Sequence, residues 1–235
     1  MVDIHAEDGD LVKEARSAIQ KANSSSKVIY IRTDVTKEDQ VKAAVEQTVK
    51  EFSRIDYAAN FAGILGPLGA TWETDTDEWK KVIDVNMIGV WLCMKHELAQ
   101  MVKQDPIVAE HGQDPERQQQ RGSIINAASV NSQIAGAGTT GYTGAKHAVL
   151  GMTRSAALEG RAMNVRVNCV SPGFLRTKLL EEPLAAQGSF GGEFWQSFET
   201  RQGRKATFDE VGDAVVMLSS PRMSLVVGVN LPIDK

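Results

Sequence analysis

Residues Arg121–Thr177 read RGSIINAASVNSQIAGAGTTGYTGAKHAVLGMTRSAALEGRAMNVRVNCVSPGFLRT, and this stretch decides the fold. It contains two apolar runs, Ser123–Ala128 and Val165–Val170, with the length and β-branched content of buried strands. Between them lies a segment with helical spacing that carries Tyr142 and ends near Gly160, a plausible helix stop. This strand–helix–strand order predicts parallel strands with a helix packed on the sheet.

Strand-like and helix-like segments alternate along the rest of the chain as well. Helical stripes cover Asp10–Ala22 and a segment that ends near Phe52, and short strands are expected at Val28–Ile31 and Ile55–Phe61. Such alternation predicts a parallel sheet with helices on both faces. We therefore expect one α/β domain over residues 1–235, a doubly wound parallel sheet of the Rossmann type.

Local signals predict where further elements begin and end. Thr36 and Thr76 each precede a helical stripe and are expected to cap it. Residues Asp209–Leu218 predict a last helix, and Leu225–Leu231 predict a last strand. Residues 105–121 interrupt the pattern with prolines and polar side chains, so we expect a surface loop there.

The composition argues against several classes of function. At 235 residues, with 42% apolar and 24% charged residues, the chain is typical of soluble domains. A net charge of −4 argues against a nucleic-acid or anionic-membrane partner. No apolar stretch is long enough to span a membrane, and the acidic start lacks the features of a signal peptide. Cys93 and Cys169 lie in apolar segments, which indicates free thiols in a reducing compartment. We expect a cytoplasmic protein without a metal site.

Three polar side chains suggest proton-transfer chemistry. Tyr142 and Lys146 lie four residues apart, so they share one face of the predicted helix, and Ser129 follows a strand. A neighbouring ammonium lowers the pKa of a tyrosine from about 10 and prepares it to exchange a proton with an alcohol or carbonyl. Ser129 can donate a hydrogen bond to a developing oxyanion. The pair alone is a weak signal, because a half-exposed tyrosine beside a solvated lysine is common. Since ligands bind at the carboxyl ends of parallel strands, we expect the three side chains to converge.

This ordered set, followed by Pro172-Gly173, resembles the short-chain dehydrogenase/reductase family over nearly the whole chain. The resemblance implies an enzyme that transfers a hydride between NAD(P) and a secondary alcohol or ketone. Ser129, Tyr142 and Lys146 match the catalytic residues of the family. Asn86 matches a fourth, which holds a water that relays protons to the lysine. A structural asparagine with satisfied hydrogen bonds is the plainer interpretation of Asn86.

The resemblance also implies a set of cofactor contacts. Asp3 matches an acidic residue that binds the adenosine ribose and repels a 2′-phosphate, which favours NAD over NADP. Asp34 and Val35 match an adenine-contacting pair, although a carboxylate at a helix start explains Asp34 equally well. The remaining matches to cofactor-binding positions are Asn60, Ala62, Gly63, Tyr142, Lys146, Pro172, Gly173, Leu175 and Thr177.

The expected partners are a small-molecule alcohol or ketone and further copies of the chain, but neither nucleic acid nor membrane. Residues from about 178 to 205 match the substrate loop of the family. The aromatic residues Phe174, Phe190, Phe194 and Trp195 could line an apolar pocket or form a locally packed cluster. The resemblance implies a homodimer or homotetramer packed through the long helices, including Tyr142–Gly160.

The phosphate-binding signature of the family is missing from the sequence. The family begins with a strand and a Thr-Gly-x-x-x-Gly-x-Gly loop, whereas Gly9 is the only glycine among the first 60 residues. We therefore expect the sheet to lack its first strand, which would lie between the strands near Asp3 and Ile55–Phe61 and leave two apolar edges. Low stability and weak dinucleotide binding would follow. The chain is then either a shortened version of a complete enzyme or a catalytically silent subunit or binding protein with the same fold.

Overall fold

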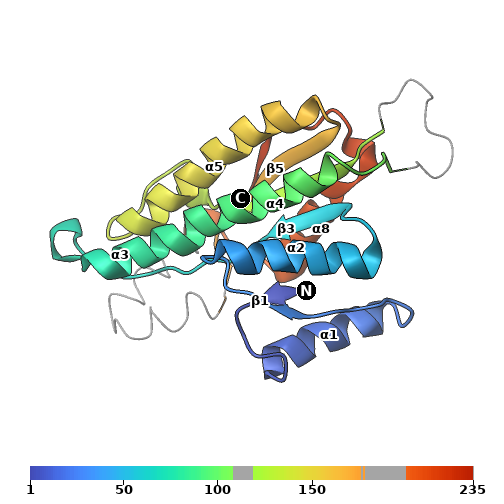
Figure 1. Cartoon of the computed structure of the whole chain (residues 1–235). Helices are drawn as coiled ribbons and strands as arrows, with labels where there is room; N and C mark the ends of the chain where they lie inside the picture. The colour runs from blue at the N-terminus through green and yellow to red at the C-terminus, as the bar shows by residue number, and fades with distance from the viewer. Residues whose placement is uncertain (108–118, 176, 178–199, 235) are drawn as a thin grey trace.

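The computed structural model describes residues 1–107, 119–175, 177 and 200–234. Figure 1 shows the order of the elements along the chain. The strands are β1 (Val2–Asp3), β2 (Ile31–Arg32), β3 (Tyr57–Asn60), β4 (Gly122–Ala127), β5 (Val165–Pro172) and β6 (Asn230–Ile233). The α-helices are α1 (Asp10–Ala22), α2 (Glu38–Phe52), α3 (Thr76–Ile83), α4 (Val90–Met101), α5 (Thr140–Arg161) and α8 (Phe208–Ser219).

All strands pair in parallel, but they form two separate sheets. One contains β1 and β2, and the other has the strand order β3-β4-β5-β6. Figure 1 shows α2, α4 and α5 over one side of the larger sheet and α8 on the other side. The prediction of a doubly wound parallel fold is confirmed, and the division between β1 and β3 falls where a strand was expected to be missing.

Strand β4 is the centre of the core, because every one of its residues is buried. Alternate side chains of a strand point to opposite faces of a sheet. Ile124 accordingly packs with Met94 of α4 and Ala156 of α5. The next residue, Ile125, packs with Val211 of α8 on the other face. Because helices cover both faces of the strand, side chains on both faces are buried and the strand has a nearly continuous apolar sequence.

Several predicted element boundaries are confirmed and others are wrong. The helix at Asp10–Ala22 is confirmed with both its ends. Thr36 and Thr76 do not cap the helices that follow them. Asp75 caps α3 by accepting hydrogen bonds from two backbone N–H groups, and the Thr36 hydroxyl instead donates to the Asp34 carboxylate over 2.7 Å.

The last strand and the second strand also differ from their predicted bounds. Strand β6 begins at Asn230 rather than at Leu225, whose side chain is 96% exposed. Strand β2 begins at Ile31, the last residue of the predicted strand. Residues 108–118, most of the predicted surface loop, lie outside the described residues. No helix in the described part of the chain is long and apolar enough to cross a membrane.

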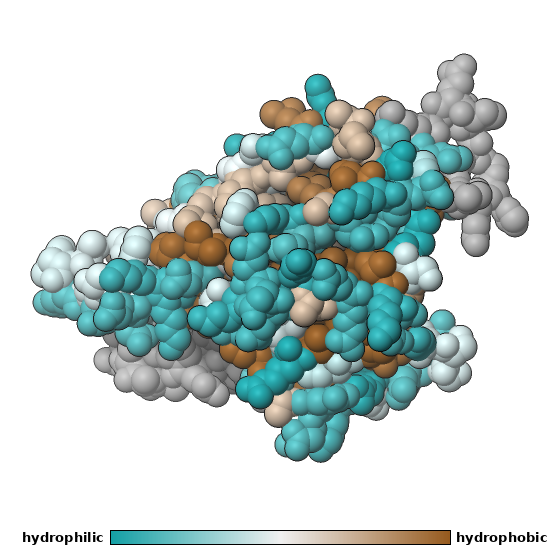
Figure 2. All heavy atoms as spheres, viewed as in Figure 1, coloured by the Kyte–Doolittle hydropathy of each residue, from teal (hydrophilic) through white to brown (hydrophobic). Residues whose placement is uncertain are grey.

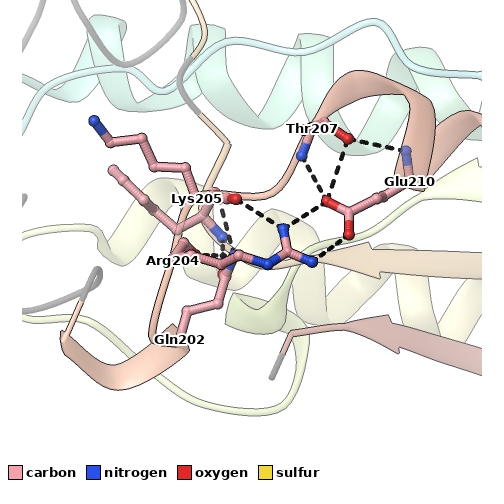
Figure 3. Close-up of polar contacts among 6 residues, drawn as sticks. Gln202, Arg204, Lys205, Thr207 and Glu210 are labelled. Atoms are coloured by element: carbon pink, nitrogen blue, oxygen red, sulfur yellow. Dashed lines mark hydrogen bonds and ion pairs between the residues drawn. The ribbon is translucent and has the colours of Figure 1, made fainter.

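A cluster of polar contacts fixes the start of α8 (Figure 3). The Thr207 hydroxyl accepts from the Glu210 N–H, and the Glu210 carboxylate accepts from the Thr207 N–H over 2.8 Å, which together form a capping box. Arg204 donates two hydrogen bonds to the same carboxylate. The Arg204 and Thr207 contacts lower the pKa of Glu210 to about 2. Helix α8 is thereby held beside the site described next.

Candidate active site

Ser129, Tyr142 and Lys146 line one cavity of about 1040 Å³. Ser129 lies two residues after the end of β4, and its Oγ accepts a hydrogen bond from the Asn131 N–H over 3.2 Å. The first turns of α5 supply Tyr142 and Lys146. The carboxyl end of β5 contributes Pro172 to the same cavity. The structure therefore brings the three predicted side chains together at the carboxyl ends of adjacent parallel strands.

The Lys146 ammonium is buried beside the tyrosine. Its Nζ donates a hydrogen bond to the Ala127 carbonyl over 2.6 Å and lies 5.6 Å from the centre of the Tyr142 ring. Only 4% of the residue is exposed. Burial lowers the pKa of Lys146 to about 8, with a smaller opposing effect from Cys169. The amine is thus mostly protonated at pH 7 and close to its titration range.

Burial dominates the electrostatics of Tyr142. Desolvation raises the pKa of the hydroxyl, and a hydrogen bond with Ser129 opposes this rise. The prediction that Lys146 lowers the pKa of Tyr142 below its ordinary value is therefore wrong for this structure. A half-buried tyrosine with a raised pKa is protonated at neutral pH and is suited to donate a proton.

Asn86 lies in a π-helical segment, Asp84–Gly89, immediately before α4. Its side chain is fully buried and satisfied, because Oδ1 accepts from the Ile64 N–H over 2.8 Å and Nδ2 donates to the Ile64 carbonyl over 2.7 Å. These bonds hold the segment after β3 close to the site. A Cβ on Gly63 would lie 3.3 Å from Asn86 Oδ1 and 3.9 Å from Lys146 Nζ, so Asn86 borders the lysine. The water-relay role stays a prediction.

The predicted cofactor residues divide between two adjoining cavities that share Phe61 and Gly63. The first cavity, of about 780 Å³, is lined by Asp3, Asp34, Val35, Asn60, Ala62 and Gly63. The second, larger cavity is lined by Tyr142, Lys146, Pro172, Gly173, Leu175 and Thr177.

The chemistry of these residues fits a bound dinucleotide. The Asp3 side chain is about half exposed, and its Oδ1 lies 2.6 Å from His5 Nδ1. Burial acts against ionisation, but hydrogen bonds from His5 outweigh it and lower the pKa of Asp3. An ionised carboxylate therefore lines the first cavity, and the Lys146 ammonium lines the second.

Sequence reasoning missed a buried polar network behind the site. Asn60 Nδ2 donates to Glu97 Oε2 over 2.9 Å and to Asn126 Oδ1 over 3.0 Å. Asn126 Nδ2 in turn donates to Thr153 Oγ1 over 3.0 Å. Burial raises the pKa of Glu97 to about 7, although the bond from Asn60 opposes this. The signal in the sequence was a single acid within the apolar run that forms α4.

The predicted aromatic pocket is described only in part. Phe174 is buried and lines the second cavity, and its N–H donates to Gln202 Oε1. The segment 178–199, with Phe190, Phe194 and Trp195, lies outside the described residues. Within the described ranges, no group of three or more His, Cys, Asp or Glu side chains is placed to hold a metal ion.

A Rossmann-type parallel sheet with serine, tyrosine and lysine at its carboxyl edge is the arrangement of a dinucleotide-dependent oxidoreductase. A family model described as enoyl-(acyl carrier protein) reductase matches residues 2–235. The chain belongs to the short-chain dehydrogenase/reductase family, and it is an NAD(P)-dependent oxidoreductase by that membership.

Named relatives and solved structures agree with this assignment. The chain is 39% identical to short-chain dehydrogenase fogB of Aspergillus ruber, over 88% of this chain and 76% of that protein. It is 36% identical to zerumbone synthase of Zingiber zerumbet, over 100% of this chain and 82% of that protein. The crystal structure of levodione reductase superimposes with a TM-score of 0.86 at 28% identity, covering 99% of this chain and 84% of that one.

We predict that Glu97 makes the fold less stable as the pH rises. Its pKa is raised in the folded protein, so the folded state binds more protons than the unfolded state between about pH 4.5 and 7. Stability should therefore fall through this window, by roughly 3 kcal/mol for a shift of this size. Glu97→Gln should flatten the profile and be the more stable form at pH 8, measured by urea unfolding from pH 5 to 8.

The exposed residue Glu46 offers a matched control, because Glu46→Gln should keep the parent slope. Identical slopes for the parent and Glu97→Gln would show that the buried carboxyl does not hold its proton.

Proposed function

We propose that the second cavity catalyses the NAD(P)-dependent interconversion of a secondary alcohol and a ketone, with Tyr142 as the general acid and base. One observation carries this proposal. The Tyr142 and Ser129 side chains line the same cavity as the buried Lys146 ammonium, whose Nζ lies 5.6 Å from the centre of the Tyr142 ring. A carbonyl oxygen that meets both hydroxyls would receive a proton from one and a hydrogen bond from the other.

Each residue has a distinct role in the proposed reaction. The bound nicotinamide supplies or accepts the hydride. Tyr142 donates its proton to the carbonyl oxygen in reduction and accepts a proton in oxidation. Ser129 donates a hydrogen bond to the same oxygen and orients it. Lys146 stabilises the phenolate that forms on Tyr142, since the charge lies next to the ring.

The lining of the cavity favours a neutral, apolar substrate. Lys146 is the only charged side chain among the described residues that line it. The other walls are mainly apolar and include Leu65, Val130, Phe174, Val211 and Val215. A carboxylate or phosphate on the substrate would lose its hydration with only one cation in the described lining, the Lys146 ammonium, which already donates to the Ala127 carbonyl. The named relatives include zerumbone synthase and (+)-borneol dehydrogenase 2.

Asp3 supports NAD as the cofactor in preference to NADP. Its carboxylate is ionised at neutral pH and borders the first cavity, where it would repel a 2′-phosphate. Solved structures similar to this chain include both ElxO with NADP bound, at 28% identity, and NAD⁺-bound xylitol dehydrogenase, at 24% identity.

Exposed apolar residues on the long helices support assembly into a homodimer or homotetramer. Trp91 on α4 is 45% exposed and Leu158 on α5 is 64% exposed. Burying such side chains against a second copy would remove apolar surface from water. The two cysteines are unpaired, which supports the proposed cytoplasmic location.

We expect Tyr142→Phe to abolish turnover while leaving the fold intact, because it removes only the hydroxyl that transfers the proton. The loss should be at least about 100-fold in kcat. Absorbance of NADH at 340 nm with a panel of cyclic ketones and alcohols measures it. Ser155→Ala, which removes an exposed hydroxyl on α5 that lines neither cavity, is the control. Equal turnover in both variants would refute the role of Tyr142, and no turnover in the parent would favour a catalytically silent protein.

We expect Asp3→Asn to shift cofactor preference toward NADP. Removing the charge relieves repulsion of a 2′-phosphate, so the ratio of the NADP and NAD dissociation constants should fall about tenfold. Calorimetric titration with each nucleotide measures the ratio. Asp8→Asn changes an exposed acid that does not line the cavity and should leave the ratio unchanged. An unchanged ratio in Asp3→Asn would place the adenosine ribose elsewhere.

We expect Trp91→Glu to dissociate the assembly, since a charge would enter an apolar interface. Light scattering after size exclusion would then give the monomer mass of 25.6 kDa. Trp72→Glu is the matched control, because Trp72 is 86% exposed and belongs to a short 3₁₀ helix, Thr71–Glu73, rather than to α4 or α5. A parent that is already monomeric, or an assembly that survives Trp91→Glu, would show that α4 does not form the interface.

A further inference from the structure

The second cavity is lined by a carboxamide that the proposed reaction does not use. Polar side chains are common where they meet water, as Figure 2 shows for the face over α2 and α3. Within mainly apolar walls, an unpaired polar atom costs free energy and therefore selects its ligand. Asn131 lines this cavity and is only 7% exposed. It lies two residues after Ser129, in the 3₁₀ turn Val130–Ser132.

A chain of hydrogen bonds holds the Asn131 side chain. Its Nδ2 donates to Thr143 Oγ1 over 3.2 Å, and Thr143 Oγ1 lies 2.8 Å from Thr139 Oγ1. Thr139 Oγ1 in turn donates to the Gly136 carbonyl over 2.8 Å. A hydroxyl has only one proton to donate. Since the Thr139 proton goes to Gly136, the Thr143 hydroxyl must donate to Thr139, and its oxygen accepts from the carboxamide.

The direction of this chain sets the orientation of the carboxamide. If the amide were turned over, Oδ1 would face the oxygen of Thr143, whose proton already goes to Thr139. Two acceptors would then meet with no proton between them, which is unfavourable. Nδ2 therefore faces Thr143, and Oδ1 lies on the other branch of the carboxamide.

Oδ1 is the atom of Asn131 that is left to bind a ligand. Among the described residues no donor bonds to this oxygen, and it is not one of the side-chain atoms that are buried from solvent without a partner. Because the residue lines the second cavity, we assign Oδ1 to that cavity. A ligand hydroxyl would pair with it, whereas a methyl group would leave it unpaired.

The carboxamide also lies close to the reacting centre. The Asn131 N–H donates to Ser129 Oγ over 3.2 Å. Ordinary bond lengths place a side-chain amide within about 5 Å of the nitrogen of its own residue, so Oδ1 lies at most about 8 Å from Ser129 Oγ. Hydrogen bonds of ordinary length at both ends leave room for a six-membered ring with oxygens on separate carbons.

We propose that Asn131 determines the substrate class of this cavity: its Oδ1 accepts a hydrogen bond from a hydroxyl on a cyclic ketone, so that the substrate is a hydroxy ketone, or the corresponding diol in the reverse direction. The inference rests on the proposed function, because the ketone oxygen is the one that meets Tyr142 and Ser129. Thr143 does not line the cavity and acts through the carboxamide. The remainder of the substrate is apolar, like the walls around it.

The first test is binding without turnover. Ligand-observed NMR titration of the full chain, without nucleotide, gives dissociation constants for 3- and 4-hydroxycyclohexanone and for 3- and 4-methylcyclohexanone. We expect the hydroxy ketone of at least one pair to bind at least about fivefold more tightly, since the methyl group leaves Oδ1 unpaired. Equal or weaker binding of both hydroxy ketones would overturn the proposal.

The preference should depend on the carboxamide. Asn131→Leu keeps the approximate size of the side chain but has no acceptor, so the preference should be lost or reversed. The bond from the Asn131 N–H to Ser129 Oγ involves only the backbone of Asn131 and is kept. Gln133→Leu is the matched control, because it makes the same kind of change at an exposed residue just after the turn that lines neither cavity. The parent preference in Asn131→Leu would contradict the assignment.

A second variant leaves Asn131 itself unchanged. Thr143→Val removes the hydroxyl that orients the carboxamide and is close in size to threonine. The preference for the hydroxy ketone should fall at least about twofold, because the amide is then free to turn away. If Asn131→Leu does not fold, this variant decides the matter, and an unchanged preference in it would overturn the proposal.

Turnover separates this inference from the proposed function. With NADH, Asn131→Leu should raise KM for the hydroxy ketone and change kcat by less than about twofold, because the remote hydroxyl binds equally in the ground and transition states. An equal loss of kcat for the hydroxy and methyl ketones would show that Asn131 only positions Ser129, and would overturn the proposal. A parent that binds with the expected preference but reduces neither ketone would refute the proposed function and support the binding role of Asn131.

Discussion

The rest of the structure depends on the burial of β4 on both its faces. A strand with helices on each side must satisfy all its backbone groups through its neighbours, and β4 does so through parallel ladders to β3 and β5. Those ladders align the carboxyl ends of three strands. Ser129 lies just past β4 at this edge. Lys146 Nζ donates a hydrogen bond to the carbonyl of Ala127, the last residue of β4. The geometry of the site is therefore a consequence of how the core is paired.

The same burial sets the electrostatic character of the site. Removing Lys146 from water costs free energy, which lowers its pKa to about 8, and the bond to Ala127 compensates only in part. Tyr142 is affected in the opposite direction, since burial disfavours its phenolate. The two shifts act in opposite directions, so the pKa of Tyr142 lies above that of Lys146. Tyr142 therefore holds its proton more tightly than Lys146 does in the folded chain.

The sequence predicted those features that depend on local pattern. The helical spacing of apolar residues predicted both ends of α1, and the two apolar runs predicted the positions of β4 and β5. These predictions succeeded because an apolar helix stripe or a buried strand is a pattern of neighbouring residues. The convergence of Ser129 with α5 followed from the rule for parallel strands. The cap of α3, the exposure of Leu225 and the raised pKa of Glu97 depend on contacts between distant segments. No local pattern contains that information, so these features were missed.

The two cavities are linked through the residues that follow β3. Phe61 and Gly63 border both cavities and lie within three residues of the end of this strand. Asn86 holds the same segment, because its side chain bonds to both the N–H and the carbonyl of Ile64. A Cβ on Gly63 would lie only 3.3 Å from Asn86 Oδ1, so a larger residue there would crowd the side chain that fixes the segment. The wall between the two cavities therefore depends on the close approach of Gly63 to Asn86, in the same way that the Lys146 position depends on the end of β4.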